Sequence, residues 1–225
     1  MSVVKAIIAA GGSSTRMRGV DKLFAQLNGM PVIAHTIAAF ESCGAISGIV
    51  VAMRSDMLEA GRSVVRSYGF GKVSGVCAGG KTRQQSVANA LDQIGACDII
   101  MVHDCARPCV SAETIMKGIS LAESHGVAVA AAPVYDTIKK VDENGRVIET
   151  VPRGELRAAH TPQVFKAEIL RKAHADPAPG ATDDAYLAER LGYEVMVYED
   201  SAENIKITTP QDLAIAEAIL ARMHG

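Results

Sequence analysis

The sequence predicts an α/β protein with a mostly parallel sheet, helices on both faces and one projecting β-hairpin. Short apolar runs alternate with segments of helical periodicity along most of the chain up to Pro133, which is the pattern of strands joined by crossover helices. Polar and charged residues follow several of these runs directly, and ligands of parallel sheets bind beyond the carboxyl ends of the strands. The alternation then breaks around an Asn-Gly pair, which is a strong hairpin signal.

The first half of the chain supplies the alternating elements. Val3–Ala9 is a nearly unbroken apolar run, as expected of a strand buried on both faces. Val32–Cys43 places Ile33 and Ile37 on one face and predicts a helix. The same reasoning predicts, in order, a strand at Gly48–Ala52, a helix at Met57–Tyr68, a strand at Val73–Cys77, a helix at Arg83–Ile94, a strand at Ile99–Val102, a helix at Ala112–Ser124 and a strand at Ala128–Pro133. This order is typical of a Rossmann-like sheet.

The hairpin is predicted from two strand-like runs, Thr137–Val141 and Arg146–Val151, on either side of Asn144-Gly145. Both turn residues tolerate positive φ. Charged residues along these runs give the hairpin no place in a parallel sheet. We therefore expect an arm at about residues 137–157 that packs on a second copy of the chain, which makes a homodimer.

The last third of the chain returns to the core. A helix is predicted at Asp183–Leu191 and a strand at Glu194–Tyr198. Thr209 can cap a final helix, since Pro210 suits the first helical position. With no linker or repeat in between, residues 1–225 are expected to form one domain.

Composition excludes several classes of function. The 225 residues are 48% apolar and 21% charged, with a net charge of −2, which disfavours a nucleic-acid or anionic-membrane surface. No apolar run reaches the ~18–20 residues that span a bilayer, and the N-terminus lacks a signal-peptide pattern. The five cysteines lack zinc-site spacing. We expect a cytoplasmic protein without nucleic-acid or membrane partners.

The loop Gly11–Met17 follows the first strand and contains Gly12, three hydroxyl residues and Arg16, with Lys22 beyond it. It is neither a Walker P-loop nor a dinucleotide fingerprint. Exposed backbone N–H groups can bind anions, and two cations would suit a polyphosphate. A solvated turn with both cations facing water explains the loop equally well.

Two further clusters follow predicted strands. The segment Gly79–Ser86 contains Arg83, for which a surface position is the better interpretation. Asp104 and Arg107 follow the most apolar strand, where charges are costly without partners. A structural ion pair would explain them, but their location favours function.

The remaining candidates are dispersed: Thr137, Arg153, Thr161 and Lys206. Lys206 stands between Ile205 and Ile207, so it either snorkels at a strand edge or points into a pocket. Together the candidates are mostly cations and hydroxyls with one prominent carboxylate, and no nucleophile lies beside a base. Such a set suits phosphoryl chemistry. A phosphate nucleophile, with a second pKa near ~6, needs no protein base.

Six stretches carry a resemblance that covers the chain from Val3 to about Ala221. They are A-A-G-G-S-S-T-R-M, V-H-D-C-A-R-P, D-T-I-K, H-T-P-Q-V-F, T-D-D-A and N-I-K-I-T-T-P-Q-D-L. Each is weak alone, but the ordered set resembles the 2-C-methyl-D-erythritol 4-phosphate cytidylyltransferase family of the non-mevalonate isoprenoid pathway. The resemblance implies transfer of CMP from CTP to methylerythritol phosphate, with Mg²⁺ as cofactor and pyrophosphate as the second product.

The resemblance also implies roles for residues. The residues that would bind CTP are Ala9, Ala10, Gly11, Gly12, Gly80 and Ser86. The catalytic residues would be Arg16, Lys22, Asp104 and Lys206, with Asp104 also near the metal. The substrate-binding residues would be Arg107, Thr137, Arg153, Thr161 and Lys206, of which Thr137 and Arg153 would reach the site of a second copy.

Three residues depart from the family pattern. Asp21 stands where proline is common, Lys81 where an acidic residue is frequent, and Cys105 where alanine is usual. The Cys105 thiol is expected to be sensitive to oxidation or alkylation. Two alternatives stay open: a cytidylyltransferase of the same fold acting on ribitol 5-phosphate, and a non-catalytic nucleotide-binding module.

Overall fold

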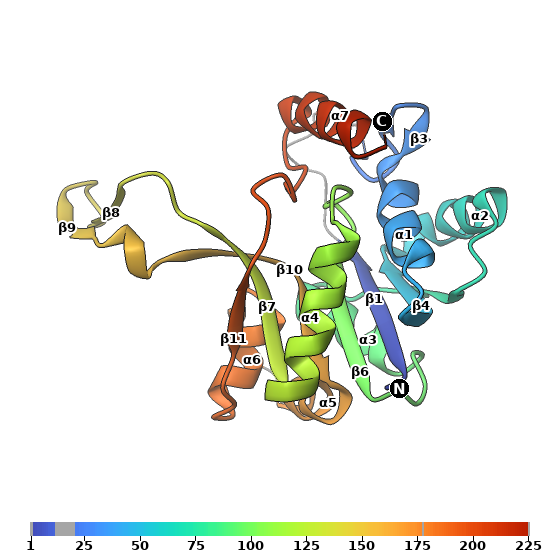
Figure 1. The fold of residues 1–225 in the computed structure, drawn as a ribbon, viewed down its shortest axis with the longest axis horizontal. Helices are drawn as coiled ribbons and strands as arrows, with labels where there is room; N and C mark the ends of the chain where they lie inside the picture. Colours follow the sequence, from blue (N-terminus) through green and yellow to red (C-terminus); the bar gives the residue numbers. More distant parts are fainter. Residues whose placement is uncertain (1, 12–20, 177, 225) are drawn as a thin grey trace.

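The computed structural model describes residues 2–11, 21–176 and 178–224. Its main sheet has seven strands in the order β11-β7-β10-β6-β1-β4-β5 (Figure 1). Their bounds are Val4–Ala10 (β1), Ile46–Met53 (β4), Val73–Ala78 (β5), Ile99–Asp104 (β6), Val127–Pro133 (β7), Arg157–Lys166 (β10) and Met196–Glu199 (β11). All neighbouring pairs run parallel except those that β10 makes with β6 and β7. The predicted, mostly parallel sheet is confirmed.

Helices cover both faces of this sheet, as predicted. The helices are Val32–Ser42 (α1), Leu58–Tyr68 (α2), Arg83–Leu91 (α3), Ala112–His125 (α4), Ala167–Ala175 (α5), Asp184–Arg190 (α6) and Pro210–His224 (α7), with 3-10 turns at Ser55–Met57 (η2) and Arg153–Glu155 (η3). Apolar residues of α1, α2 and α4 pack on one face of the sheet, where Ile8 of β1 points. Residues of α3, α5 and α6 pack on the other face, where Ile7 points. None of the described helices is long and apolar enough to cross a membrane.

The predicted hairpin is present and projects from the body (Figure 1). Strands β8 (Ile138–Val141) and β9 (Val147–Val151) pair only with each other. The Asp142 carboxylate accepts hydrogen bonds from the backbone N–H groups of Asn144 and Arg146, and Gly145 has φ of 79°. These hydrogen bonds lie within the hairpin, so they hold the turn without contacts to the rest of the protein.

Strand β10 was not predicted, because Pro162 interrupts its sequence and cannot donate to a ladder. The strand accommodates this proline through a shift of register between Ala159 and Gln163. Helix α5 and the short hairpin of Gln26–Leu27 (β2) and Met30–Pro31 (β3) were also not predicted. The predicted helix at Arg83–Ile94 ends earlier, at Leu91.

Candidate active site

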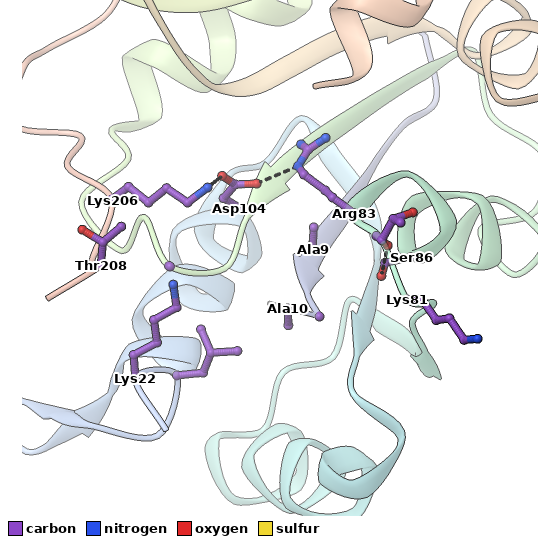
Figure 2. Close-up of a pocket in the computed structure, with 13 residues that line it drawn as sticks. Ala9, Ala10, Lys22, Lys81, Arg83, Ser86, Asp104, Lys206 and Thr208 are labelled. Atoms are coloured by element: carbon purple, nitrogen blue, oxygen red, sulfur yellow. Dashed lines mark hydrogen bonds and ion pairs between the residues drawn. The ribbon is translucent and has the colours of Figure 1, made fainter. Parts of the chain in front are cut away.

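A cavity of about 470 Å³ lies at the carboxyl edge of the sheet (Figure 2). In the sheet register Ala9 of β1 stands beside Asp104 of β6, so the two strands end together and their following loops meet. The cavity is lined by Ala9, Ala10, Gly11, Lys22, Leu23, Lys81, Thr82, Arg83, Ser86, Asp104, Ala106, Lys206 and Thr208. Segments that are distant in sequence therefore form one wall of polar and cationic groups.

Asp104 is the electrostatic centre of this cavity. Lys206 Nζ donates to its Oδ2 at 2.6 Å and Arg83 Nε to its Oδ1 at 3.1 Å (Figure 2). Burial of Asp104 opposes ionisation, but the charges of Arg83 and Lys206 outweigh it and hold the pKa of this carboxyl well below its usual range. Asp104 is therefore a carboxylate at any physiological pH.

Arg83 is not the surface residue that the sequence favoured. It begins α3 and bridges two carboxylates, since its Nη1 also donates to Asp184 of α6. The Arg83 side chain is 25% exposed and that of Asp184 only 1%. Although burial works against the charge, the carboxylates of Asp184 and Asp104 raise the pKa of Arg83. Because Asp184 lies 101 residues beyond Arg83, no local pattern could have revealed the pair.

The glycine-rich loops come together at Ser86. The buried Ser86 hydroxyl accepts a hydrogen bond from the Gly80 amide at 3.1 Å and donates to the Thr82 carbonyl at 2.9 Å. A Cβ atom on Gly11 would lie 2.8 Å from the same hydroxyl, so only glycine lets β1 approach it. Gly11 from the first loop and Lys81 and Thr82 from the second line the cavity beside Ser86, whereas Gly80 does not line it.

Lys22 lies across the cavity from Arg83 and Ser86 and extends toward it (Figure 2). Its Nζ donates to the Ile207 carbonyl at 3.1 Å, which links this segment to the one that carries Lys206. Gly12 and Arg16 lie outside the described residues. The Asp21 carboxylate accepts a hydrogen bond from the Leu23 amide at 3.0 Å, so a local turn defines the path of the chain around Lys22.

A second cavity of about 230 Å³ shares Arg83, Asp104 and Lys206 with the first. Its other lining residues are Arg107, Ala159, His160, Thr161, Gln163, Thr182 and Asp183. The Thr161 hydroxyl accepts from the Asp104 amide at 3.0 Å, which ties β10 to the end of β6. Arg107 Nη1 donates to the Asn204 carbonyl at 2.6 Å, and burial lowers the pKa of Arg107. The two cavities therefore meet at Asp104 and Lys206.

Thr137 and Arg153 lie apart from both cavities, at the base of the arm. Both are exposed, and the Arg153 guanidinium donates to the Tyr135 carbonyl. Neither lines the cavities that Asp104 joins. The chain does not bring these two predicted substrate residues to its own site.

The described residues contain no group of three or more His, Cys, Asp or Glu side chains that could hold a metal ion. Asp104 is the one carboxylate among the described residues that line the larger cavity. Each of its oxygens has a cationic partner but keeps a further lone pair. The site therefore fits Mg²⁺ as one oxygen ligand among others that phosphates would supply.

Cys105 contradicts the expectation of a reactive thiol. The residue is fully buried, and burial strongly raises the pKa of its thiol. The reactive species in oxidation and alkylation is the thiolate, which is not available here. Lys81 lines the cavity, but its side chain points away from Asp104 (Figure 2).

Comparisons with known proteins identify the same family along nearly the whole chain. Residues 4–222 match the model of the 2-C-methyl-D-erythritol 4-phosphate cytidylyltransferase family, IspD. The enzyme of that name from Dehalococcoides mccartyi (strain CBDB1) is 42% identical over 219 residues, covering 97% of this chain and 96% of the relative. That from Bacillus mycoides (strain KBAB4) is 42% identical over 218 residues, covering 95% and 96%.

Solved structures agree with this assignment. The crystal structure of 2-C-methyl-D-erythritol 4-phosphate cytidylyltransferase from Thermus thermophilus superposes with a TM-score of 0.80 at 36% identity, covering 99% of this chain and all of that one. The crystal structure of 4-diphosphocytidyl-2C-methyl-D-erythritol synthase from Anaerococcus prevotii DSM 20548 gives a TM-score of 0.86 at 27% identity, with 98% and 96% covered.

Proposed function

From the premise that this chain belongs to the 2-C-methyl-D-erythritol 4-phosphate cytidylyltransferase family, we propose how its residues divide the reaction. The enzyme is a nucleotidyltransferase that transfers CMP from CTP to 2-C-methyl-D-erythritol 4-phosphate in isoprenoid precursor biosynthesis. The products are CDP-methylerythritol and pyrophosphate. The family model and the relatives name a cytidylyltransferase of methylerythritol phosphate, which favours this reaction over a ribitol phosphate substrate and over a non-catalytic module.

The larger cavity takes CTP. Ala9, Ala10, Gly11 and Ser86 line it, and the Gly80 amide, which does not itself line the cavity, holds the Ser86 hydroxyl in place. Backbone donors and acceptors of this kind can read the edge of a cytosine ring. Lys22, with Gly12 and Arg16 of the preceding loop, holds the triphosphate, because fixed cations and consecutive N–H groups bind phosphates.

The smaller cavity takes methylerythritol phosphate, with its phosphate at the end where the cavities meet. The observation that supports this most strongly is that Lys206 and Asp104 line both cavities and are ion-paired at 2.6 Å. Arg107 and Thr161 line the smaller cavity alone and would bind the rest of the substrate.

Catalysis then consists of positioning and charge stabilisation. An oxygen of the substrate phosphate attacks the α-phosphorus of CTP in line, and the bond to the pyrophosphate oxygen breaks. The attacking phosphate is largely ionised at neutral pH, with a second pKa near ~6, so no side chain has to take a proton. Lys206 carries three N–H donors and can bond the phosphate while keeping Asp104. Lys22 and Arg16 stabilise the charge that develops on the pyrophosphate.

Mg²⁺ is the proposed cofactor and would neutralise phosphate charge when bound. Asp104 would supply one protein oxygen to it, and the phosphates of CTP the rest. This assignment is supported by Asp104 being ionised and facing both cavities.

The active unit is proposed to be a homodimer of single-domain chains in the cytoplasm. Thr137 and Arg153 would complete the site of the second copy, which is supported by their exposure next to β8 and within η3. Exposed apolar residues of β9, Val147 at 58% and Ile148 at 61%, would be covered in the dimer.

Two measurements test this division of roles. The first is pyrophosphate release from CTP with methylerythritol phosphate and ribitol 5-phosphate side by side, where the former should react far faster. The second is a reciprocal pair of variants: Ser86→Ala should raise mainly the KM for CTP, and Thr161→Val mainly that for methylerythritol phosphate. The assignment of the two cavities is wrong if both variants affect both constants equally.

A further inference from the structure

A histidine–aspartate pair outside the proposed machinery lies beside the smaller cavity, which His160 lines and Asp200 does not. His160 Nδ1 lies 2.8 Å from Asp200 Oδ2, and the two side chains are 13% and 0% exposed. The Asp200 carboxylate also accepts hydrogen bonds from Thr114 Oγ1 at 2.9 Å and from Asn204 Nδ2 at 2.7 Å. The established reaction does not by itself require such a pair, so its purpose needs an explanation.

The chemistry of the pair fixes the histidine tautomer. Burial opposes the charge on Asp200, but hydrogen bonds from His160, Asn204 and Thr114 outweigh it and lower the pKa of this carboxyl. An ionised carboxylate only accepts hydrogen bonds, so Nδ1 of His160 must carry the proton. In a neutral ring Nε2 is then an acceptor. Among the described residues, none bonds to this nitrogen.

The position of the pair directs this acceptor toward substrate. His160 lines the smaller cavity, whereas Asp200 lines a different one, with Ser111 and Thr114. Nδ1 is held by Asp200, which does not line the smaller cavity, so Nε2 is the ring nitrogen left for a group bound there. Asn204 connects Asp200 to β10, since its Nδ2 donates to the Thr161 carbonyl at 2.8 Å as well as to the Asp200 carboxylate.

We propose that His160 accepts a hydrogen bond from a hydroxyl of the substrate polyol and that Asp200 is the residue that positions it. This inference rests on the proposed placement of methylerythritol phosphate in the smaller cavity. With the substrate phosphate at Lys206 and Asp104, the polyol end extends along the rest of the cavity, where His160 lies. A site with a dedicated acceptor discriminates against analogues that lack the hydroxyl.

Substrate analogues test the hydrogen bond directly. Methylerythritol phosphate carries hydroxyls on carbons 1, 2 and 3, so the three monodeoxy compounds are assayed at pH 8 with saturating CTP. With the unaltered enzyme, one of them should lose about tenfold in kcat/KM, as expected for a lost hydrogen bond. In His160→Ala that analogue should react as well as the parent compound. If each analogue loses as much in His160→Ala as in the unaltered enzyme, the inference is overturned.

Controls separate this inference from the placement on which it rests. His125→Ala, at the exposed C-terminal end of α4, should leave all constants unchanged. If Thr161→Val raises the KM for methylerythritol phosphate but His160→Ala does not, only the role of His160 fails. If neither variant changes that constant, the placement of substrate fails.

The tautomer that Asp200 imposes on His160 has a spectroscopic signature of its own, independent of activity. Nitrogen-15 NMR of the histidine rings distinguishes Nδ1–H from Nε2–H, and His160→Gln identifies the signals by their loss. The unaltered enzyme should show His160 as the Nδ1–H tautomer, and Asp200→Asn should increase the Nε2–H form. A predominant Nε2–H tautomer in the unaltered enzyme would overturn the proposal, whether or not the variants fold.

Discussion

Replacing Lys206 with alanine should abolish most of the activity while leaving the fold almost unchanged. Lys206 and Arg83 bind the same carboxylate, but the Lys206 side chain is 42% exposed and that of Arg83 only 25%. An ion pair as exposed as that of Lys206 contributes about 1 kcal/mol or less to stability. A cation that stabilises charge in the transition state contributes about 3–4 kcal/mol to catalysis, which is roughly 10²–10³ in kcat.

Arg83→Ala is the matched comparison, because it removes the other cation from Asp104. This variant leaves both Asp104 and Asp184, whose side chains are 11% and 1% exposed, without their shared partner. An uncompensated buried charge costs about 3–5 kcal/mol of unfolding free energy; Asp104 keeps Lys206 and Asp184 keeps His174, so the expected loss is smaller than this but larger than that of Lys206→Ala. The same carboxylate thus pairs with Lys206, for which we propose a catalytic role, and with Arg83, for which we expect a structural one.

The two variants are compared by urea unfolding and by steady-state pyrophosphate release. The expected pattern is a loss of kcat with nearly unchanged stability for Lys206→Ala, and a loss of stability for Arg83→Ala. The reasoning is refuted if Lys206→Ala destabilises the protein as much as Arg83→Ala does, or if it keeps the kcat of the unaltered enzyme.

Four further predictions can be measured independently. Arg16→Ala and Lys22→Ala should each lower kcat far more than they raise the KM for CTP in steady-state assays; unchanged kcat in both would contradict the triphosphate assignment. Gly11→Ala should raise the KM for CTP, because its Cβ would lie 2.8 Å from the Ser86 hydroxyl and displace it from the Gly80 amide; an unchanged KM would argue against that close approach. Burial lowers the pKa of His103 from 6.5 to about 4, so between these pH values the unfolded chain binds more protons than the folded one. The free energy of unfolding should therefore fall by about 3 kcal/mol as the pH drops from 6.5 to 4. Equilibrium unfolding of His103→Asn across this range should show a weaker dependence of that free energy on pH. Arg153→Ala should be inactive alone but recover about a quarter of full activity when mixed with inactive Lys22→Ala, because half of the dimers would then contain one intact shared site; no recovery would count against shared sites.

Much of the scaffold could be predicted because its signals are local. The strand Val4–Ala10 and the helix Val32–Ser42 lie within one residue of their predicted bounds, since apolar runs and helical periodicity encode them directly. The Asn-Gly turn likewise identified the hairpin. Strand β10 was missed because Pro162 interrupts the strand pattern in its sequence. Only the structure shows that this segment pairs with β6 and β7.

Several residues that line the cavities could be singled out from the sequence, but the network that joins them could not. Lys206 was noticed because it interrupts two isoleucines, and Asp104 because it ends a buried strand. Their pairing joins positions 102 residues apart, and Arg83 pairs both with Asp104 and with Asp184, which lies 101 residues beyond Arg83. His160 and Asp200 gave no separate signal at all, because each is an ordinary polar residue until the fold places one beside the other.

Strand β10 also connects the arm directly to the wall of the smaller cavity. The chain leaves β9, passes through η3 and continues as β10, which carries His160 and Thr161 past the end of β6 before it enters the core at Val164. Bending the arm would therefore displace the Thr161 hydroxyl, which accepts a hydrogen bond from the Asp104 amide. A molecule that binds the arm and bends it would therefore inhibit this enzyme without entering either cavity.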